Sequence, residues 1–205
     1  MGLLYIKEVE GNSILGLWEI DDAIETMAKN LSVIPEQSIF NTLKRKKEFI
    51  ATRLLLDAMF AGAEIQYHQS GEPFLLNDET YISISHSKNR VVILLNRWKR
   101  IGVDLQYTAH KILRLKEKFL NAEELSQIPA NKMDDALHIY WCAKEALFKL
   151  GGVENVDFKT HLMIEPFNIE NIGKIRANML MNNSREFVTL HYEKMEEYYL
   201  VYTVD

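Results

Sequence analysis

The sequence predicts an α+β fold of two lobes with a similar plan, each built as a helix on a sheet. The first observation is that, in both halves of the 205-residue chain, a segment of helical periodicity is followed by runs of β-forming residues. The second is that no low-complexity tract, short repeat or Pro/Gly/Ser-rich linker separates further parts. We therefore expect an N-terminal lobe over residues 1–105 and a C-terminal lobe over residues 106–205, joined near residues 104–111.

The first lobe opens with two predicted strands, Leu3–Val9 and Ser13–Ile20, around the turn Glu10-Gly11-Asn12. Asp21 or Asp22 is placed to cap a short helix through Ala28.

A longer helix is expected over Gln37–Phe60, because apolar residues recur at helical spacing and Gly62 suits the C′ position. These apolar residues are Ile39, Leu43, Ile50 and Leu54. The strands expected after this helix are Ile65–His68, Tyr81–Ser85, Arg90–Asn96 and Ile101–Leu105.

The second lobe begins with a helical segment, Ile112–Leu120. Asn121 is then placed as the N-cap of a helix starting at Ala122. A long helix over residues 132–150 follows and stops at Gly151-Gly152. Antiparallel strands complete the lobe, and they are Lys159–Ile164, Lys174–Met181, Phe187–Tyr192 and Tyr198–Val204.

The composition restricts the kinds of function to consider. A formal net charge of −5 argues against a protein that wraps nucleic acid with its whole surface. The single cysteine, Cys142, cannot form an internal disulfide, which suits a reducing compartment. No apolar run is long enough to span a membrane, and Lys7 and Glu8 come too early for a secretory signal. We expect a cytoplasmic protein without a nucleic-acid or membrane partner.

The segment from Trp141 to Lys149 carries the strongest chemical signal. Residues four apart share a helix face, so Trp141, Glu145 and Lys149 line up on one side. Asp104 supplies a second carboxylate at the end of a predicted strand. Two carboxylates with nearby lysines suit a magnesium ion shared with a phosphorylated substrate.

Other polar features have an ordinary explanation beside a functional one. The alternation in Ser83-Ile84-Ser85-His86-Ser87 favours a solvated strand face, although a histidine and hydroxyls at a strand end also hold phosphate oxygens. The run Lys44-Arg45-Lys46-Lys47, with Arg53 beyond it, is typical of a solvated helix face or of a phosphate contact. Cys142 is interpreted as a small buried hydrophobe, and the scattered histidines predict no zinc site.

Three blocks, taken together and in order, resemble the 4′-phosphopantetheinyl transferases, in particular the larger monomeric two-lobed type. Gly71-Glu72-Pro73-Phe74 with Ile82–Ser87 is similar to the family's G-K-P followed by N-I-S-H-S. Ile101-Gly102-Val103-Asp104-Leu105 is similar to G-[IV]-D-[IVL]-E. Residues 141–149 match W-x-x-K-E-A-x-x-K at every fixed position, and Phe119–Glu124 resembles the segment between the last two blocks.

The resemblance implies a fold, a reaction and partners. The fold is two similar helix-on-sheet lobes in a pseudo-twofold arrangement with the site in the cleft between them, within a monomer. The reaction is that of a holo-acyl-carrier-protein synthase: Mg2+-dependent transfer of the 4′-phosphopantetheine arm of coenzyme A to a serine of an acyl or peptidyl carrier protein. Adenosine 3′,5′-bisphosphate is released. The carrier serves fatty acid, polyketide or nonribosomal peptide biosynthesis.

The resemblance also implies residue roles. The metal ligands are Asp104, Gln106 and Glu145, and the catalytic residues are Glu145, Lys149 and Asp104. The implied coenzyme A contacts are Lys44, Lys47, Arg53, Glu72, Pro73, Ser85, His86, Lys144 and Lys149.

Two positions depart from the family. Gln106 replaces an acidic ligand with an uncharged amide, and Glu72 replaces the lysine of G-K-P with an acid near the expected nucleotide.

The carrier partner and two alternatives complete the expectations. Carrier proteins are acidic, so the basic segment before Phe119 and Leu120 is a candidate docking patch or an ordinary exposed helix, and its cations are Lys111, Arg114, Lys116 and Lys118. One alternative function is a catalytically impaired binder of coenzyme A or of a carrier protein with the same fold. The other is a different magnesium-dependent enzyme acting on a phosphorylated metabolite.

Overall fold

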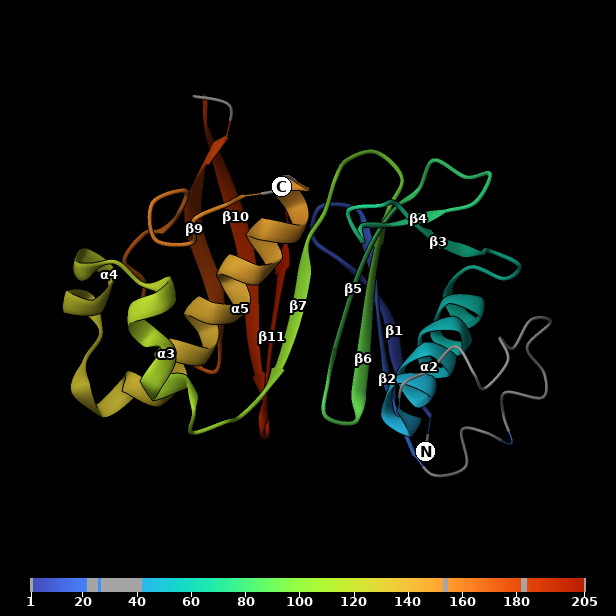
Figure 1. The fold of residues 1–205 in the computed structure, drawn as a ribbon, viewed down its shortest axis with the longest axis horizontal. Coiled ribbons are helices and arrows are strands. Elements are labelled where there is room, and N and C mark those ends of the chain that lie inside the picture. The colour runs from blue at the N-terminus through green and yellow to red at the C-terminus, as the bar shows by residue number, and fades with distance from the viewer. Residues whose placement is uncertain (1, 22–25, 27–41, 153–154, 182–183, 205) are drawn as a thin grey trace. The chain divides into compact units, whose positions relative to one another are not determined.

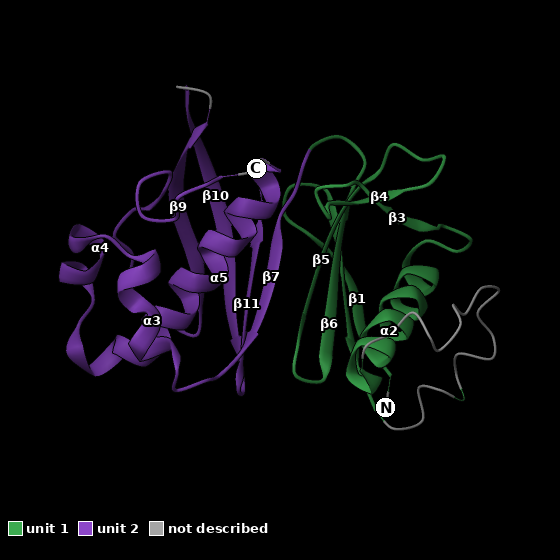
Figure 2. Cartoon of the chain, in the orientation of Figure 1, with its two compact units in different colours: residues 1–99 green, residues 100–205 purple. Residues whose placement is uncertain are grey.

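The computed structural model describes residues 2–21, 26, 42–152, 155–181 and 184–204. The chain divides into two compact units, residues 1–99 and residues 100–205 (Figure 2). This division falls earlier than the predicted boundary after residue 105. The physical reason is that the strand Val103–Tyr107 pairs with a strand at the C-terminal end of the chain and so belongs to the second unit.

Unit 1 contains a four-stranded antiparallel sheet with one helix packed against it. The strand order is β1-β2-β6-β5, formed by Leu3–Val9, Ser13–Glu19, Arg90–Asn96 and Tyr81–Ser87. Helix α2, Leu43–Met59, contacts β2 and β6 (Figure 1). The described part of the unit also contains a small hairpin of β3, Ile65–Tyr67, and β4, Pro73–Leu75. The sequence did not predict β4.

Helix α2 begins later than its predicted start. Thr42 is the N-cap, and its hydroxyl accepts a hydrogen bond from the Arg45 N–H at 3.2 Å. Residues 37–41 of the predicted helix, and most of the short helix predicted through Ala28, lie outside the described residues. The helix ends at the cap residue Phe60, which places Gly62 one position beyond the predicted C′. Gly62 adopts φ +79°, which favours glycine.

Unit 2 contains a five-stranded antiparallel sheet covered by a long helix. The strand order is β7-β11-β10-β9-β8, formed by Val103–Tyr107, Tyr198–Thr203, Ser184–Met195, Ile172–Met181 and Leu162–Ile164. Helix α5, Met133–Gly151, packs against β7 and β11 (Figure 1). Helix α5 is preceded by two shorter helices, α3 at Ile112–Phe119 and α4 at Ala122–Gln127, and by a 3-10 turn at Ala130–Lys132.

Both helix-end signals read from the second half of the sequence are confirmed. The Asn121 side chain accepts from the Glu124 N–H at 2.9 Å, and the Glu124 carboxylate accepts from the Asn121 N–H at 3.1 Å, which together form a capping box. Gly152 ends α5 in the left-handed conformation at φ 59°. These two ends fix where α4 and α5 start and stop around the core of the unit.

The two units share a succession of elements. In unit 1, β2 is followed by α2 and then by the antiparallel pair β5 and β6, and β6 lies beside β2. In unit 2, β7 is followed by α5 and then by the pair β10 and β11, and β11 lies beside β7. The mixed α and β character expected from the sequence is confirmed. Among the helices of the described ranges, none has the length and apolar character needed to cross a membrane.

Candidate active site

Asp104 and Lys149 are brought together where β7 lies against α5. Asp104 is buried, with 4% of its surface exposed. The Lys149 amino group donates one hydrogen bond to Oδ1 of Asp104 and another to the Val103 carbonyl oxygen, both at 2.8 Å. An ion pair in a partly buried site is stronger than one that is fully exposed to solvent. The contact between Lys149 and Asp104 joins the last turn of α5 to β7, which is an edge strand of the sheet.

Glu145 lies one helical turn before Lys149 and is half-buried. Burial, together with the negative charge of Asp104, raises the pKa of the Glu145 carboxyl to about 7, although the Lys149 cation acts in the opposite direction. The two carboxylates are therefore close enough to influence each other. A carboxyl group with a pKa near neutrality suits proton transfer, and its anion gains from any further cation placed beside it.

Cys142 lies close to Asp104, Glu145 and Lys149, on the buried side of these residues. The side chain is fully buried, and Sγ lies 3.6 Å from the Tyr199 carbonyl oxygen. Burial raises the pKa of the Cys142 thiol well above its usual value, and the negative charge of Asp104 adds to this effect. The thiol is therefore protonated and unsuited to nucleophilic attack, as the sequence indicated.

The donor set at this site suits magnesium shared with a substrate. Within the described part of the chain, no group of three or more His, Cys, Asp or Glu side chains is placed to hold a metal ion. Asp104 and Glu145 instead provide two carboxylates, and Gln106 lies two residues along β7, on the same face of the strand as Asp104. Magnesium commonly takes one or two carboxylates and completes its shell with phosphate oxygens and water.

Lys144 does not lie where the prediction of a pyrophosphate contact requires it. Its side chain is fully buried, and its amino group donates to Oε2 of Glu124 at 2.7 Å and to the Phe158 carbonyl oxygen at 2.8 Å. Glu124 also accepts from the Ile164 N–H at 3.0 Å. Burial lowers the pKa of Lys144, whereas Glu124 acts in the opposite direction. The pair is a structural link between α4, α5 and β8.

Trp141 belongs to the core, as expected. Its ring lies edge-on to Phe119 with centroids 5.1 Å apart, and tilted against Phe158 at 5.9 Å. These contacts fix the side of α5 that packs on α3 and leave Glu145 and Lys149 at the junction with β7.

In unit 1, a buried acid missed by the sequence analysis contacts two of the predicted phosphate-binding residues. Glu48 has 6% of its surface exposed, and its Oε1 lies 3.4 Å from His86 Nδ1 and 3.6 Å from Lys44 Nζ. His86 and Lys44 are exposed, whereas Ser85 is buried at 7%. The serine side of β5 is therefore not the solvated face that the alternation favoured. The spacing of Lys44 and Glu48, one helical turn apart, was the available signal for this pair.

The remaining predicted residues of unit 1 lie on α2 and in the β3–β4 hairpin. The Arg53 guanidinium stacks 3.2 Å above the Phe49 ring, and burial lowers the pKa of Arg53. Lys47 is half-buried on the same helix. Glu72 accepts a hydrogen bond from the His68 N–H at its carbonyl oxygen, and Pro73 pairs with Tyr67 across the hairpin.

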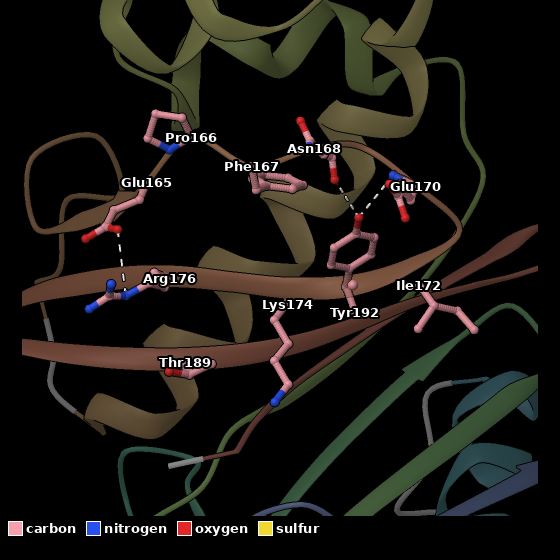
Figure 3. A pocket seen from close by; sticks show the side chains of 11 residues that line it. Glu165, Pro166, Phe167, Asn168, Glu170, Ile172, Lys174, Arg176, Thr189 and Tyr192 are labelled. Carbon is pink, nitrogen blue, oxygen red and sulfur yellow. Dashed lines mark hydrogen bonds and ion pairs between the residues drawn. The ribbon is translucent and has the colours of Figure 1, made fainter.

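A shallow pocket of about 700 Å3 lies elsewhere in unit 2, over β9, β10 and the segment before β9 (Figure 3). The Tyr192 hydroxyl donates to the Asn168 carbonyl oxygen at 2.9 Å and accepts from the Glu170 N–H at 3.0 Å. Arg176 pairs with Glu165 at 3.9 Å on the pocket wall. None of the sequence-predicted site residues lines this pocket. Its polar contacts anchor the segment of residues 165–170 to the sheet.

Comparisons with known proteins point to one family. The family model of the 4′-phosphopantetheinyl transferase superfamily matches residues 100–203, half of the chain, and this range contains Asp104, Glu145 and Lys149. The 4′-phosphopantetheinyl transferase HetI of Nostoc sp. (strain PCC 7120) is 24% identical over 160 residues, which covers 66% of this chain and 68% of that protein.

Proposed function

This chain belongs to the 4′-phosphopantetheinyl transferase superfamily, and we propose that it moves the 4′-phosphopantetheine arm of coenzyme A onto a serine of an acyl or peptidyl carrier protein. The observation that carries the proposal is the cluster of Asp104, Glu145 and Lys149 inside the matched region. We further propose the holo-acyl-carrier-protein synthase type of activity, in a cytoplasmic monomer. The carrier would serve fatty acid, polyketide or nonribosomal peptide biosynthesis.

Asp104, Glu145 and Gln106 would hold Mg2+ at this site. Bound there, the ion supplies positive charge beside the pyrophosphate of coenzyme A. Burial and then the negative charge of Asp104 raise the pKa of Glu145, and a divalent cation held by both carboxylates would stabilise their ionised forms. Gln106 contributes a neutral oxygen, so the metal affinity depends on Asp104 and Glu145 and on the substrate phosphates.

Lys149 is suited to bind a phosphate oxygen while it orients Asp104. An ammonium group has three N–H donors, and the contacts to Val103 and Asp104 use two of them. The remaining N–H is available to an oxygen of the pyrophosphate. In that position, the Lys149 charge would stabilise the negative charge that develops on the leaving nucleotide.

Glu145 is suited to accept the proton of the carrier serine. The serine oxygen forms a bond to the phosphorus atom next to the pantetheine arm, and the bond from that phosphorus to the bridging oxygen breaks. The electron pair leaves with adenosine 3′,5′-bisphosphate, and the serine proton passes to Glu145.

The predicted contacts of unit 1 complete the proposal for coenzyme A. Lys44, Lys47 and His86 provide cationic or hydrogen-bonding groups for the nucleotide phosphates. Arg53 and Ser85 would act beside them, and the backbone at Glu72 and Pro73 would contact adenine. Lys144 is left out of the set, because its amino group is fully buried against Glu124.

The carrier protein is proposed to dock on α3. Lys111, Arg114 and Lys118 are exposed along this helix, and their charge complements an acidic partner. Phe119 and Leu120, which follow these cations in the sequence, are each only 1% exposed and add no apolar surface to the patch. Leu113, at 43% exposed, provides the apolar contact instead.

Intact-protein mass spectrometry tests the proposed function directly. An apo acyl carrier protein is incubated with this protein, coenzyme A and Mg2+, and its mass is expected to rise by one phosphopantetheine arm. Addition of EDTA should abolish the gain. If several carrier types gain no mass although coenzyme A binds, the chain is instead a non-catalytic binder of the same fold. Binding of another nucleotide in preference to coenzyme A would favour a different phosphate-dependent enzyme.

A further inference from the structure

Gly102 lies where the chain enters β7, in direct contact with the backbone of α5. A Cβ atom at this position would collide with the carbonyl oxygen of Ala146 and would lie 2.8 Å from its carbonyl carbon and 3.1 Å from the Leu150 nitrogen. All three atoms belong to the helix backbone, so no change of side-chain rotamer makes room. The strand approaches the helix this closely because residue 102 has no side chain.

Thr203, at the end of β11, holds Gly102 from the other side. The Thr203 N–H donates to the Gly102 carbonyl oxygen at 3.0 Å, and the Thr203 hydroxyl accepts from the Gly102 N–H at 3.0 Å. Thr203 is only 1% exposed, so both hydrogen bonds are shielded from water. Gly102 is therefore fixed between a sheet strand and a helix.

This contact lies beside the proposed metal ligands. Gly102 precedes Asp104 by two residues on the strand side, and Ala146 directly follows Glu145 on the helix side. The Arg100 side chain adds a second tie to the same part of α5, by a hydrogen bond from Nε to the Leu150 carbonyl oxygen at 2.9 Å. The separation of the two carboxylates therefore depends on how closely the strand and the helix meet at Gly102.

We propose that Gly102 and Thr203 are positioning residues for the metal site: Thr203 holds Gly102 against α5, and the contact sets the separation of Asp104 and Glu145. Neither residue touches substrate. The inference rests on the proposed function, because it assigns a purpose to that site. It extends the site to Thr203, a residue at the end of β11 that belongs to none of the sequence motifs.

The test compares substitutions that open the contact with a matched control. Gly102→Ala should push β7 away from α5, because the added Cβ collides with the backbone of the helix. Thr203→Val removes the hydroxyl acceptor at similar volume, and Thr203→Ser restores it. Gly173→Ala is the control for added crowding in the same sheet, because a Cβ on Gly173 of β9 would meet the Tyr192 ring at 2.7 Å, and two strands lie between β9 and β7.

Two quantities are measured in each folded variant: Mn2+ binding by electron paramagnetic resonance with coenzyme A present, and the turnover number with a carrier protein. We expect Gly102→Ala and Thr203→Val to weaken Mn2+ binding by about tenfold or more. Turnover should fall by up to about a hundredfold, because a shift near 1 Å is enough to disrupt a reactive geometry. Thr203→Ser and Gly173→Ala should keep both quantities close to those of the unmodified protein.

The positioning role and the proposed function fail in different ways. If the unmodified protein transfers no phosphopantetheine, the proposed function is wrong, but Mn2+ binding still tests the positioning role. Unchanged Mn2+ affinity in Thr203→Val, or an equal loss in Gly173→Ala, would overturn the positioning role. If Gly102→Ala does not fold, Thr203→Val still tests the positioning role, because this substitution adds no atoms at the contact between β7 and α5.

Discussion

The amino group of Lys149 lies 2.8 Å from Oδ1 of Asp104, and this contact joins the last turn of α5 to β7. Glu145 lies one turn earlier on the same helix, with a pKa raised to about 7 by burial and by Asp104. One cation and two carboxylates thus share a half-buried space. Such a group is stable only when its charges remain balanced, and a divalent cation with phosphate oxygens provides that balance.

Neutralising either carboxylate should abolish most of the proposed activity. Asp104→Asn and Glu145→Gln keep the side-chain shape but remove a charge that binds the metal. Each is expected to cut turnover by roughly a hundredfold or more, on the scale of about 3 kcal/mol for the loss of a key electrostatic stabiliser. Steady-state transfer assays with a carrier protein provide the measurement. Near-normal rates in both variants, with correct folding, would remove the proposed mechanism.

The stability of the metal-free protein should fall as the pH rises through the range in which Glu145 ionises. The folded-state pKa is about 7, above the ordinary value of 4.5. The folded protein therefore holds this proton to higher pH than the unfolded chain, and the associated stability is complete below pH 4.5 and lost as the pH passes about 7. The side chain is half-buried, so we expect roughly 1–3 kcal/mol after allowance for solvent screening.

Denaturant unfolding in EDTA checks this pH dependence. The unmodified protein should lose stability between pH 4.5 and 7.5 relative to Glu145→Gln, which cannot ionise at this position. Parallel pH profiles for the two proteins would show that the carboxyl has no raised pKa in the folded state.

Breaking the buried pair of Lys144 and Glu124 should damage the fold and leave coenzyme A binding intact in the remaining folded protein. Lys144→Met leaves the Glu124 carboxylate buried without its cation, which typically costs about 3–5 kcal/mol. Adding Glu124→Gln should recover much of the loss, since the amide oxygen still accepts from the backbone and no charge is buried. Thermal unfolding measures the loss, and calorimetric titration measures coenzyme A affinity. A raised dissociation constant without lost stability would instead restore Lys144 as a phosphate contact.

The pair also shows what the sequence allowed us to predict about the site. Helical spacing alone places Glu145 and Lys149 on one face, and the structure does so. Lys144 and Glu145 are neighbours in sequence, yet successive residues of a helix point about 100° apart. One therefore faces β7 and the other enters the core. The burial of Lys144 depends on Glu124, which lies on another helix, and local spacing carries no information about such a distant partner.

The bounds of the strands show the same difference between what local sequence patterns predict and what contacts with distant segments decide. The strands β1 and β6 have their predicted bounds, Leu3–Val9 and Arg90–Asn96, because long β-forming runs with clear turns mark them. The three-residue strand β4 was missed, since its only support is pairing with β3. Strand β10 extends well beyond the predicted Phe187–Tyr192 because β9 supplies partners along its length. Pairing between segments decides these bounds, and periodicity does not record it.

Charge reversal on α3 should weaken the interaction with the carrier and leave coenzyme A binding unchanged. Arg114 and Lys118 lie one turn apart and are both exposed, so their replacement by glutamate alters the surface without disturbing the core. An acidic carrier would then be repelled, and its Michaelis constant should rise several-fold at low salt. The effect should shrink at high ionic strength, because salt screens exposed charges.

Arg185→Glu is the matched control for this docking prediction, since Arg185 is also exposed in unit 2 but lies on β10. It changes the net charge in the same direction and so isolates position from total charge. Kinetics with varied carrier concentration should separate Arg114→Glu and Lys118→Glu from this control. A carrier Michaelis constant unchanged in the α3 variants, or raised equally in Arg185→Glu, would place carrier docking elsewhere. The Michaelis constant for coenzyme A should stay the same in all three proteins, because neither surface contains its proposed contacts.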